Sequence, residues 1–159
     1  MGLDQDFLDH AVRLARENVA RGGRPFGAVL VERGRVIATG VNEIFRTNDP
    51  SAHAELQAIR SACAALGRPR LDGCVMYASG QPCPMCLAAM HMTGFAEVVF
   101  AYSNAEADPF GLSTARTYAE MAKPLAEQAI AIRQQAPSTI EGEPPLYEAW
   151  RTHQATTLR

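Results

Sequence analysis

The stretch SGQPCPMCLAAM, residues 79–90, places two cysteines at the beginning of a predicted helix. Proline suits the first helical position, where a missing N–H costs nothing, so we expect a helix from Pro84 to about Thr93. Cys83 and Cys86 are three residues apart, nearly one helical turn, and therefore lie on one face. Because a helix N-terminus favours anions, both thiols ionise readily there and suit Zn²⁺. Redox-active cysteine pairs share this spacing, so the motif alone leaves metal binding and thiol redox chemistry open.

The sequence on either side of this stretch alternates between helical and strand patterns. Apolar residues at helical spacing predict a first helix over 4–20. The run FGAVLVERGRVIATGV, residues 26–41, predicts a hairpin that turns at Glu32, Arg33 and Gly34. The other predicted elements are a helix from Ser51 to Leu66, strands at 74–79 and 96–102, a helix near 112–122, a strand near 129–134 and a helix near 144–156. A hairpin followed by alternating helices and strands predicts an α/β fold with helices packed on a mixed sheet.

Length and composition favour one soluble globular domain. The 159 residues are 47% hydrophobic and 20% charged, with a net charge of −2. Proteins that bind nucleic acid normally carry a basic face, so we do not expect nucleic-acid binding. No apolar run is long enough to span a membrane, and the acidic N-terminus does not resemble a signal peptide. Four cysteines in such a chain are expected to be thiols or metal ligands in the cytoplasm.

A second motif, SAHAELQAI at residues 51–59, supplies the rest of a metal site. His53 together with Cys83 and Cys86 makes three zinc ligands, and three protein ligands leave a fourth position for water, as in catalytic sites. On a regular helix Glu55 is about 200° around the axis from His53, so both reach one ion only if it lies over the helix end. We therefore interpret Glu55 as the base beside a zinc-bound water.

His-x-Glu followed by Pro-Cys-x-x-Cys is the signature of zinc-dependent deaminases. The stretches PFGAVLV, NDPSAHAELQAIRSAC, LDGCVMYAS, PCPMCLAAM and EAW resemble the bacterial guanine deaminases of the cytidine deaminase superfamily, most strongly between residues 25 and 102. The tRNA adenosine deaminases are similar over the same core. The resemblance implies a single zinc-binding domain over residues 1–159, with a three-layer α/β/α fold and a five-stranded mixed sheet. It also implies a homodimer, in which the C-terminal segment can reach the partner subunit.

The resemblance implies a hydrolytic deamination that releases ammonia. Zn²⁺ lowers the pKa of its bound water, and Glu55 then passes protons to a ring nitrogen and to the leaving ammonia. By the family pattern, the backbone N–H groups of Ala54 and Cys83 hold a substrate carbonyl. Asn42 matches the substrate-binding asparagine of the family, and Phe26 matches the aromatic beside the base pocket. From the residues alone, Asn42 could equally be a turn residue and Phe26 part of the strand core.

Three positions depart from the guanine deaminase pattern. Gln81 stands where the family usually carries Glu, which keeps the hydrogen-bonding reach and removes a charge. Thr114 stands where the family carries an acid that binds the purine edge, and Arg159 stands at the place of a C-terminal aromatic. Guanine, converted to xanthine, is the expected substrate. Another amino-purine, a pterin, a triazine or a pyrimidine remains an alternative, because a pocket that hydrogen-bonds its substrate discriminates strongly when a partner is missing.

Three rival functions remain open at this point. A tRNA adenosine deaminase would need a basic approach surface, which the acidic balance of charge does not favour. A structural zinc module would need a fourth protein ligand. A thiol redox enzyme would leave His53 and Glu55 without a role. The remaining cysteines, Cys63 and Cys74, are expected in the core.

Overall fold

A mixed sheet of four strands forms the centre of the structure, a computed structural model that describes residues 2–138 and 142–157. The strands are β1 (Gly27–Glu32), β2 (Arg35–Val41), β3 (Val75–Gly80) and β4 (Glu97–Tyr102), in the spatial order β2-β1-β3-β4. β1 runs antiparallel to both β2 and β3, whereas β3 and β4 are parallel. The predicted mixed sheet is confirmed.

The hairpin between β1 and β2 turns where the sequence predicted. Arg33 and Gly34 both have positive φ, at 50° and 73°. Two central residues with positive φ are typical of the tight turns whose twist matches a hairpin. The turn therefore sets the register of β1 against β2. Within this hairpin, β1 is buried over most of its length.

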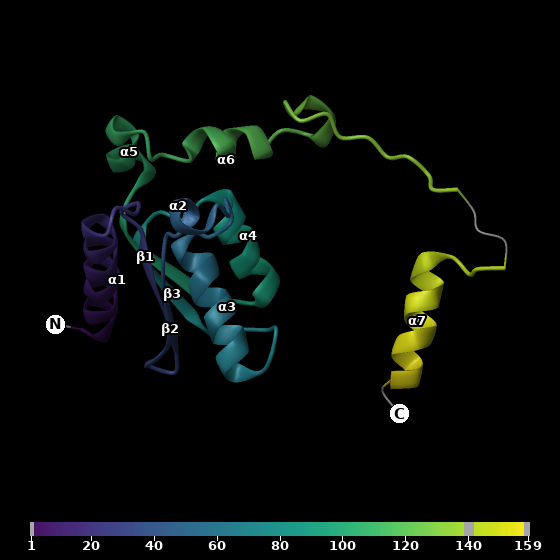
Figure 1. Ribbon diagram of the computed structural model, residues 1–159, viewed down its shortest axis with the longest axis horizontal. Coiled ribbons are helices and arrows are strands. Elements are labelled where there is room, and N and C mark those ends of the chain that lie inside the picture. Colours follow the sequence, from purple (N-terminus) through teal and green to yellow (C-terminus); the bar gives the residue numbers. More distant parts are fainter. Residues whose placement is uncertain (1, 139–141, 158–159) are drawn as a thin grey trace. The chain divides into compact units, whose positions relative to one another are not determined.

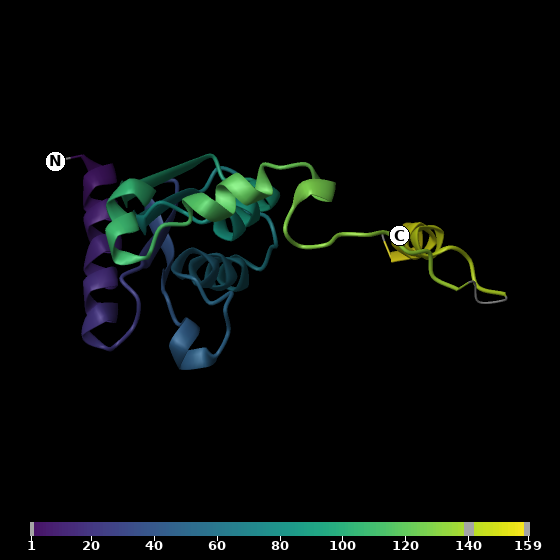
Figure 2. The same cartoon turned by 90° about the horizontal axis from the view of Figure 1, so that it is seen from above.

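Helices cover both faces of the sheet (Figures 1 and 2). The helix α1 (Leu3–Ala20) packs on one face, where Val29, Val31 and Tyr77 form a buried cluster with Ala11. Alternate residues of a strand point to opposite faces. The neighbours of these residues therefore belong to a larger core on the other face, beneath α3 (Ala54–Leu66) and α4 (Pro84–Thr93).

The remaining elements are short, apart from the last helix. A one-turn helix α2 (Ile44–Thr47) interrupts the loop after β2. After β4 come α5 (Asn104–Ala107), a 3₁₀ turn η1 (Asp108–Phe110) and α6 (Ala115–Met121). The chain divides into two units at Pro124, and the second unit, Leu125–Arg159, contains the 3₁₀ turn η2 (Leu125–Glu127) and α7 (Leu146–Thr157). No helix of the described residues is both long and apolar enough to cross a membrane.

The predicted strand near 129–134 is wrong, and with it the expected count of five strands. Residues 131–138 have no regular structure, and Ile130 and Ile132 are 76% and 50% exposed. Their alternation with smaller residues imitates a strand, but a strand also needs a neighbour to hydrogen-bond with. Among the described residues no strand pairs with this segment, so the sheet has four strands.

The other elements follow the prediction with shifted ends. The second long helix begins at Ala54 instead of Ser51, because His53 is its N-cap and has an extended backbone. The helix expected near 112–122 is shorter, and α2 and α5 were not predicted. The late start of α3 matters for the site, because it places His53 outside the helix.

Candidate metal centre and active site

Two helix N-termini meet at the predicted metal ligands. His53 and Cys83 are the N-cap residues of α3 and α4, and both have extended backbones. Because an N-cap residue is not helical, its side chain can turn over the end of the helix. Cys86 lies in the first turn of α4, where its backbone N–H donates to Cys83 Sγ over 3.5 Å. One imidazole and two thiols therefore gather over the two helix ends.

The three side chains have the spacing that zinc requires. His53 Nδ1 lies 3.4 Å from Cys83 Sγ and 3.6 Å from Cys86 Sγ, and the two sulfurs are 3.5 Å apart. Tetrahedral zinc with its usual bond lengths separates two sulfurs by about 3.8 Å and a sulfur from an imidazole nitrogen by about 3.6 Å. Among the described residues, this is the one group of three His, Cys, Asp or Glu side chains that could hold a metal ion. The donor set fits zinc and leaves a fourth position.

Of the three ligand side chains, Cys83 is the one whose pKa is lowered. Hydrogen bonds from Cys86 and then His53 lower the pKa of Cys83 to about 4, against the effect of burial. The bond to Cys83 raises the pKa of His53. The hydrogen bond between Cys86 and Cys83, together with burial, raises the pKa of Cys86, which therefore keeps its proton. A divalent cation would displace this proton, since zinc binds the thiolate.

Glu55 borders the cluster and is almost completely buried. The carboxylate is 7% exposed, and its Oε2 lies 3.6 Å from Cys86 Sγ. Desolvation raises the pKa of Glu55 above its usual range, which favours a carboxyl that takes up and returns a proton. Since His53 is an N-cap outside the helix, the angle expected for a regular helix does not separate it from Glu55. Both side chains reach the same place over the helix end.

The predicted backbone donors lie at the same helix ends. Ala54 is the first residue of α3 and is buried, and Cys83 is the N-cap of α4. The first N–H groups of a helix have no partner within it. Their position beside the ligands suits an acceptor oxygen bound near the metal.

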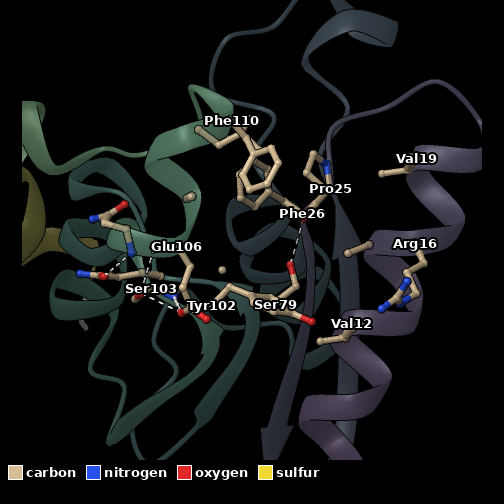
Figure 3. Close-up of a pocket in the computed structure, with 16 residues that line it drawn as sticks. Val12, Arg16, Val19, Pro25, Phe26, Ser79, Tyr102, Ser103, Glu106 and Phe110 are labelled. Atoms are coloured by element: carbon tan, nitrogen blue, oxygen red, sulfur yellow. Dashed lines mark hydrogen bonds between the residues drawn. The ribbon is translucent and has the colours of Figure 1, made fainter.

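Asn42 and Phe26 lie next to each other but line different cavities. The Asn42 backbone N–H donates to the Phe26 carbonyl over 3.1 Å, and its side-chain oxygen accepts from the Ile44 N–H over 3.3 Å. Asn42 borders a cavity of about 340 Å³, and Phe26 borders one of about 440 Å³ between α1 and α5 (Figure 3). The metal ligands line neither of these two cavities, but Phe26 packs against the buried cluster that contains Ala54, Cys83 and Cys86.

Comparison with known proteins identifies the family. The sequence matches the model of the cytidine and deoxycytidylate deaminase zinc-binding region over residues 1–102. The chain belongs to this deaminase family. It is 42% identical to guanine deaminase from Bacillus subtilis over 148 residues, which cover 92% of this chain and 93% of the relative. The crystal structure of that guanine deaminase superposes on 93% of each chain with a TM-score of 0.82.

Two other relatives of this deaminase show the same core. The tRNA-specific adenosine deaminase from Agrobacterium fabrum is 45% identical over 105 residues, which cover 66% of each chain. The structure of guanine deaminase from Nitrosomonas europaea has a TM-score of 0.64 at 30% identity, covering 68% of this chain and 63% of that one. The resemblance to guanine deaminases is therefore confirmed, as are the α/β fold with flanking helices and the zinc-binding character of the family.

Two of the three residues at which this deaminase departs from the guanine deaminase pattern lie in the described part of the chain, and both form hydrogen bonds. The Gln81 side-chain oxygen accepts from the Asn104 N–H over 2.9 Å, so it holds the start of α5. Thr114 is half-buried, and its N–H donates to Asn104 Oδ1 over 2.9 Å. Arg159 lies outside the described residues.

Sequence reasoning about this family member missed Tyr118. Its hydroxyl donates to the Pro82 carbonyl over 2.6 Å, directly before Cys83. Burial raises the pKa of Tyr118, and electrostatic interaction with the acidic groups of the cluster raises it further, so the hydroxyl stays protonated and donates. A side chain that binds a backbone carbonyl leaves no spacing pattern, and no sequence signal could have found it.

Proposed function

We propose that this protein catalyses the zinc-dependent hydrolytic deamination of guanine to xanthine, with release of ammonia. The observation that carries the proposal is a buried carboxylate, Glu55, beside a ligand set that fits zinc and leaves one position open. A guanine deaminase with 42% identity over most of both chains supports guanine as the substrate.

The proposed reaction divides the work between the ligands and Glu55. His53, Cys83 and Cys86 would hold Zn²⁺, which supplies a water with a pKa near neutrality. Glu55 takes the proton from the attacking water and delivers it to a ring nitrogen of the substrate. The hydroxide left from the water bonds to the ring carbon that bears the exocyclic amine. Glu55 then moves the remaining proton of that hydroxyl to the amine, so that the carbon–nitrogen bond breaks, a carbonyl forms and ammonia leaves. Proton transfer of this kind typically contributes about 10²–10⁴-fold to a rate.

We assign substrate binding to four residues around this centre. The N–H groups of Ala54 and Cys83 would donate to a substrate carbonyl, because they are the free donors of two helix ends. The Asn42 amide would hydrogen-bond the ring edge, and Phe26 would contact its face. The backbone bond between Asn42 and Phe26 supports their acting as a pair.

Thr114 is the residue on which the identity of the ring depends. A threonine side chain has one oxygen, so it cannot form the two parallel hydrogen bonds that the two oxygens of a carboxylate form with a pair of N–H groups. Since sites that lack a hydrogen-bond partner lose selectivity, another amino-purine, a pterin, a triazine or a pyrimidine is the alternative substrate class.

The test is ammonia release by zinc-loaded protein on a panel of these rings, with the Glu55→Ala protein as the blank. Turnover of guanine supports the proposal in full. If the protein released ammonia from another ring but not from guanine, the proposed reaction would stand and the substrate would be that other ring. Silence on every ring, together with salt-dependent tRNA binding, would instead support a tRNA adenosine deaminase.

We also propose that residues 1–159 act as one functional domain and that the protein is a homodimer in the cytoplasm. Met85 and Met92 lie exposed on α4, and Tyr147 and Trp150 are exposed on α7, which supports contacts with a second copy. In that dimer the C-terminal segment would reach the partner subunit. Thiolate ligands favour a reducing compartment. Sedimentation that gives twice the mass of 17.2 kDa would support the dimer, and a monomer at micromolar concentration would refute it.

A further inference from the structure

The segment that follows β4 is attached to the metal-binding loop at two points. At one end, the Asn104 N–H donates to Gln81 Oε1 over 2.9 Å. At the other, the Tyr118 hydroxyl donates to the Pro82 carbonyl over 2.6 Å. Gln81 and Pro82 directly precede Cys83, the first cysteine of the cluster. We call residues 103–118 the cover segment. It ends in the first half of α6, which lies at the end of the sheet where α4 begins (Figures 1 and 2).

The cover segment is braced internally, so its two attachments are connected. Asn104 Oδ1 accepts from the Thr114 N–H over 2.9 Å and from its hydroxyl over 3.3 Å. The short helix α5 is held by a capping box between Ser103 and Glu106. The Tyr118 attachment therefore belongs to a hydrogen-bonded unit and is not an isolated surface contact.

A hydrogen bond to the Pro82 carbonyl can orient the next residue, the metal ligand Cys83. A peptide unit is planar from one Cα to the next, so a hydrogen bond to this oxygen restrains the plane that ends at the Cα of Cys83. The Cys83 backbone is extended, and its side chain projects from this plane toward His53 and Cys86. A change in the plane would tilt Sγ away from the triangle that fits zinc.

We propose that Tyr118 is a positioning residue of the metal centre: by holding the Pro82–Cys83 peptide it retains the bound metal and couples the cover segment to it. The proposal rests on the zinc site assigned above. Tyr118 contacts neither substrate nor metal in this account, and it acts through Cys83. Residues that orient metal ligands from outside the coordination shell typically change metal affinity by about 10–100-fold when they are replaced.

The chain offers a matched control. The Tyr77 hydroxyl also donates one hydrogen bond, to Asp4, on the face of the sheet covered by α1. Tyr77→Phe removes the same hydroxyl group as Tyr118→Phe and one hydrogen bond, here to a carboxylate and not to a backbone carbonyl. Any general loss of stability should appear in both variants, whereas an effect on the metal centre should appear only in Tyr118→Phe.

The experiment is zinc transfer from the full-length, zinc-loaded protein to a chromophoric chelator in excess. We expect Tyr118→Phe to release zinc about 10-fold faster than the wild type, and Tyr77→Phe to release it at the wild-type rate. Equal rates for the wild type and a folded Tyr118→Phe would overturn the proposal. An equal acceleration in both variants would overturn it too.

A second measurement uses only the wild-type protein. Coupling is reciprocal, so if the cover segment retains zinc, zinc must stabilise the cover segment by the same factor. We expect zinc to slow hydrogen exchange at the amides of Asn104 and Thr114, both of which donate bonds within this network. Exchange that does not respond to zinc would overturn the proposal without any variant having to fold.

Failure of the proposed reaction gives a different result. Zinc release and hydrogen exchange need no turnover. A protein whose Tyr118→Phe variant loses zinc quickly, but which deaminates no ring, would support the inference and refute the proposed function. A wild-type protein that retains no zinc would overturn both.

Discussion

At the scale of single residues, the N-cap positions of His53 and Cys83 make the site. In a regular helix, residues two apart point in nearly opposite directions. Because His53 precedes α3 with an extended backbone, its ring and the Glu55 carboxylate converge. Cys83 uses the same position on α4. The His-x-Glu and Cys-x-x-Cys motifs therefore both describe a residue outside a helix followed by one inside it.

Gln81 shows how a departure from the family pattern can be tolerated. Its side-chain oxygen accepts the Asn104 N–H, and a glutamate oxygen would accept it equally well. We expect Gln81→Glu to leave the free energy of unfolding within about 0.5 kcal/mol of the wild type. Gln81→Ala should lower it by about 0.5–1.5 kcal/mol, because the N–H loses its partner. Urea unfolding of both variants measures this, and equal stability of Gln81→Ala and wild type would contradict the role.

At the scale of elements, the close approach of β2 to α3 fixes the helix that begins at the metal site. A Cβ added at Gly40 would lie 2.1 Å from the Ala54 carbonyl oxygen and 2.8 Å from the Ala58 nitrogen. Both are backbone atoms and cannot rotate away. The absence of a side chain at Gly40 thus lets α3 sit directly on the strand.

Gly40→Ala should therefore displace α3 and disturb His53. We expect a loss of about 1–3 kcal/mol in the free energy of unfolding, with reduced zinc retention. Val36→Ala on the same strand, where Val36 is 42% exposed, is the control and should change the stability by about 0.5 kcal/mol or less. Denaturant unfolding and metal analysis test this, and full zinc content with wild-type stability in Gly40→Ala would refute it.

Most of the helices and strands could be predicted from the sequence. Apolar patterns predicted α1, α3 and all four strands, and proline at the first helical position predicted α4. The strand expected near 129–134 failed because its apolar alternation has no partner strand, and pairing is not a local property. The helix α5 was missed, although the capping box of Ser103 and Glu106 marks its start.

Some residues of the candidate site could be predicted from the sequence and others could not, because contacts set by the fold leave no local pattern. His53, Glu55, Cys83 and Cys86 form a motif whose spacing reflects the chemistry, and the structure brings them together. Tyr118 and Asn104 contact the metal-binding loop through backbone groups, which any sequence supplies. Such contacts depend on the fold and not on residue spacing.

At the scale of the whole molecule, the metal centre is part of the hydrophobic core. Cys83, Cys86 and Ala54 belong to the same buried cluster as Leu30 and Met76 of the sheet. Without a cation, the cluster must hold a thiolate in this buried environment. A bound cation neutralises that charge, so we expect metal binding to stabilise the entire fold.

Removal of zinc should therefore lower the melting temperature. Zinc at a free concentration 100 times its dissociation constant contributes about 2.7 kcal/mol. For a protein of this size, the loss corresponds to about 5–10 °C. Calorimetry before and after chelation, with zinc added back as the control, measures the shift. An unchanged melting temperature would show that the cluster does not bind zinc in the folded state.

The most direct test of the whole account compares the wild type with Glu55→Ala, measuring zinc content and ammonia release from guanine on the same preparations. We expect both proteins to bind one zinc ion, because Glu55 is not a ligand, and Glu55→Ala to lose about 10²–10⁴-fold in rate. A Glu55→Ala protein that releases ammonia at a rate near that of the wild type would contradict the assigned chemistry. A variant that also loses its zinc would show that Glu55 serves the metal and not the proton.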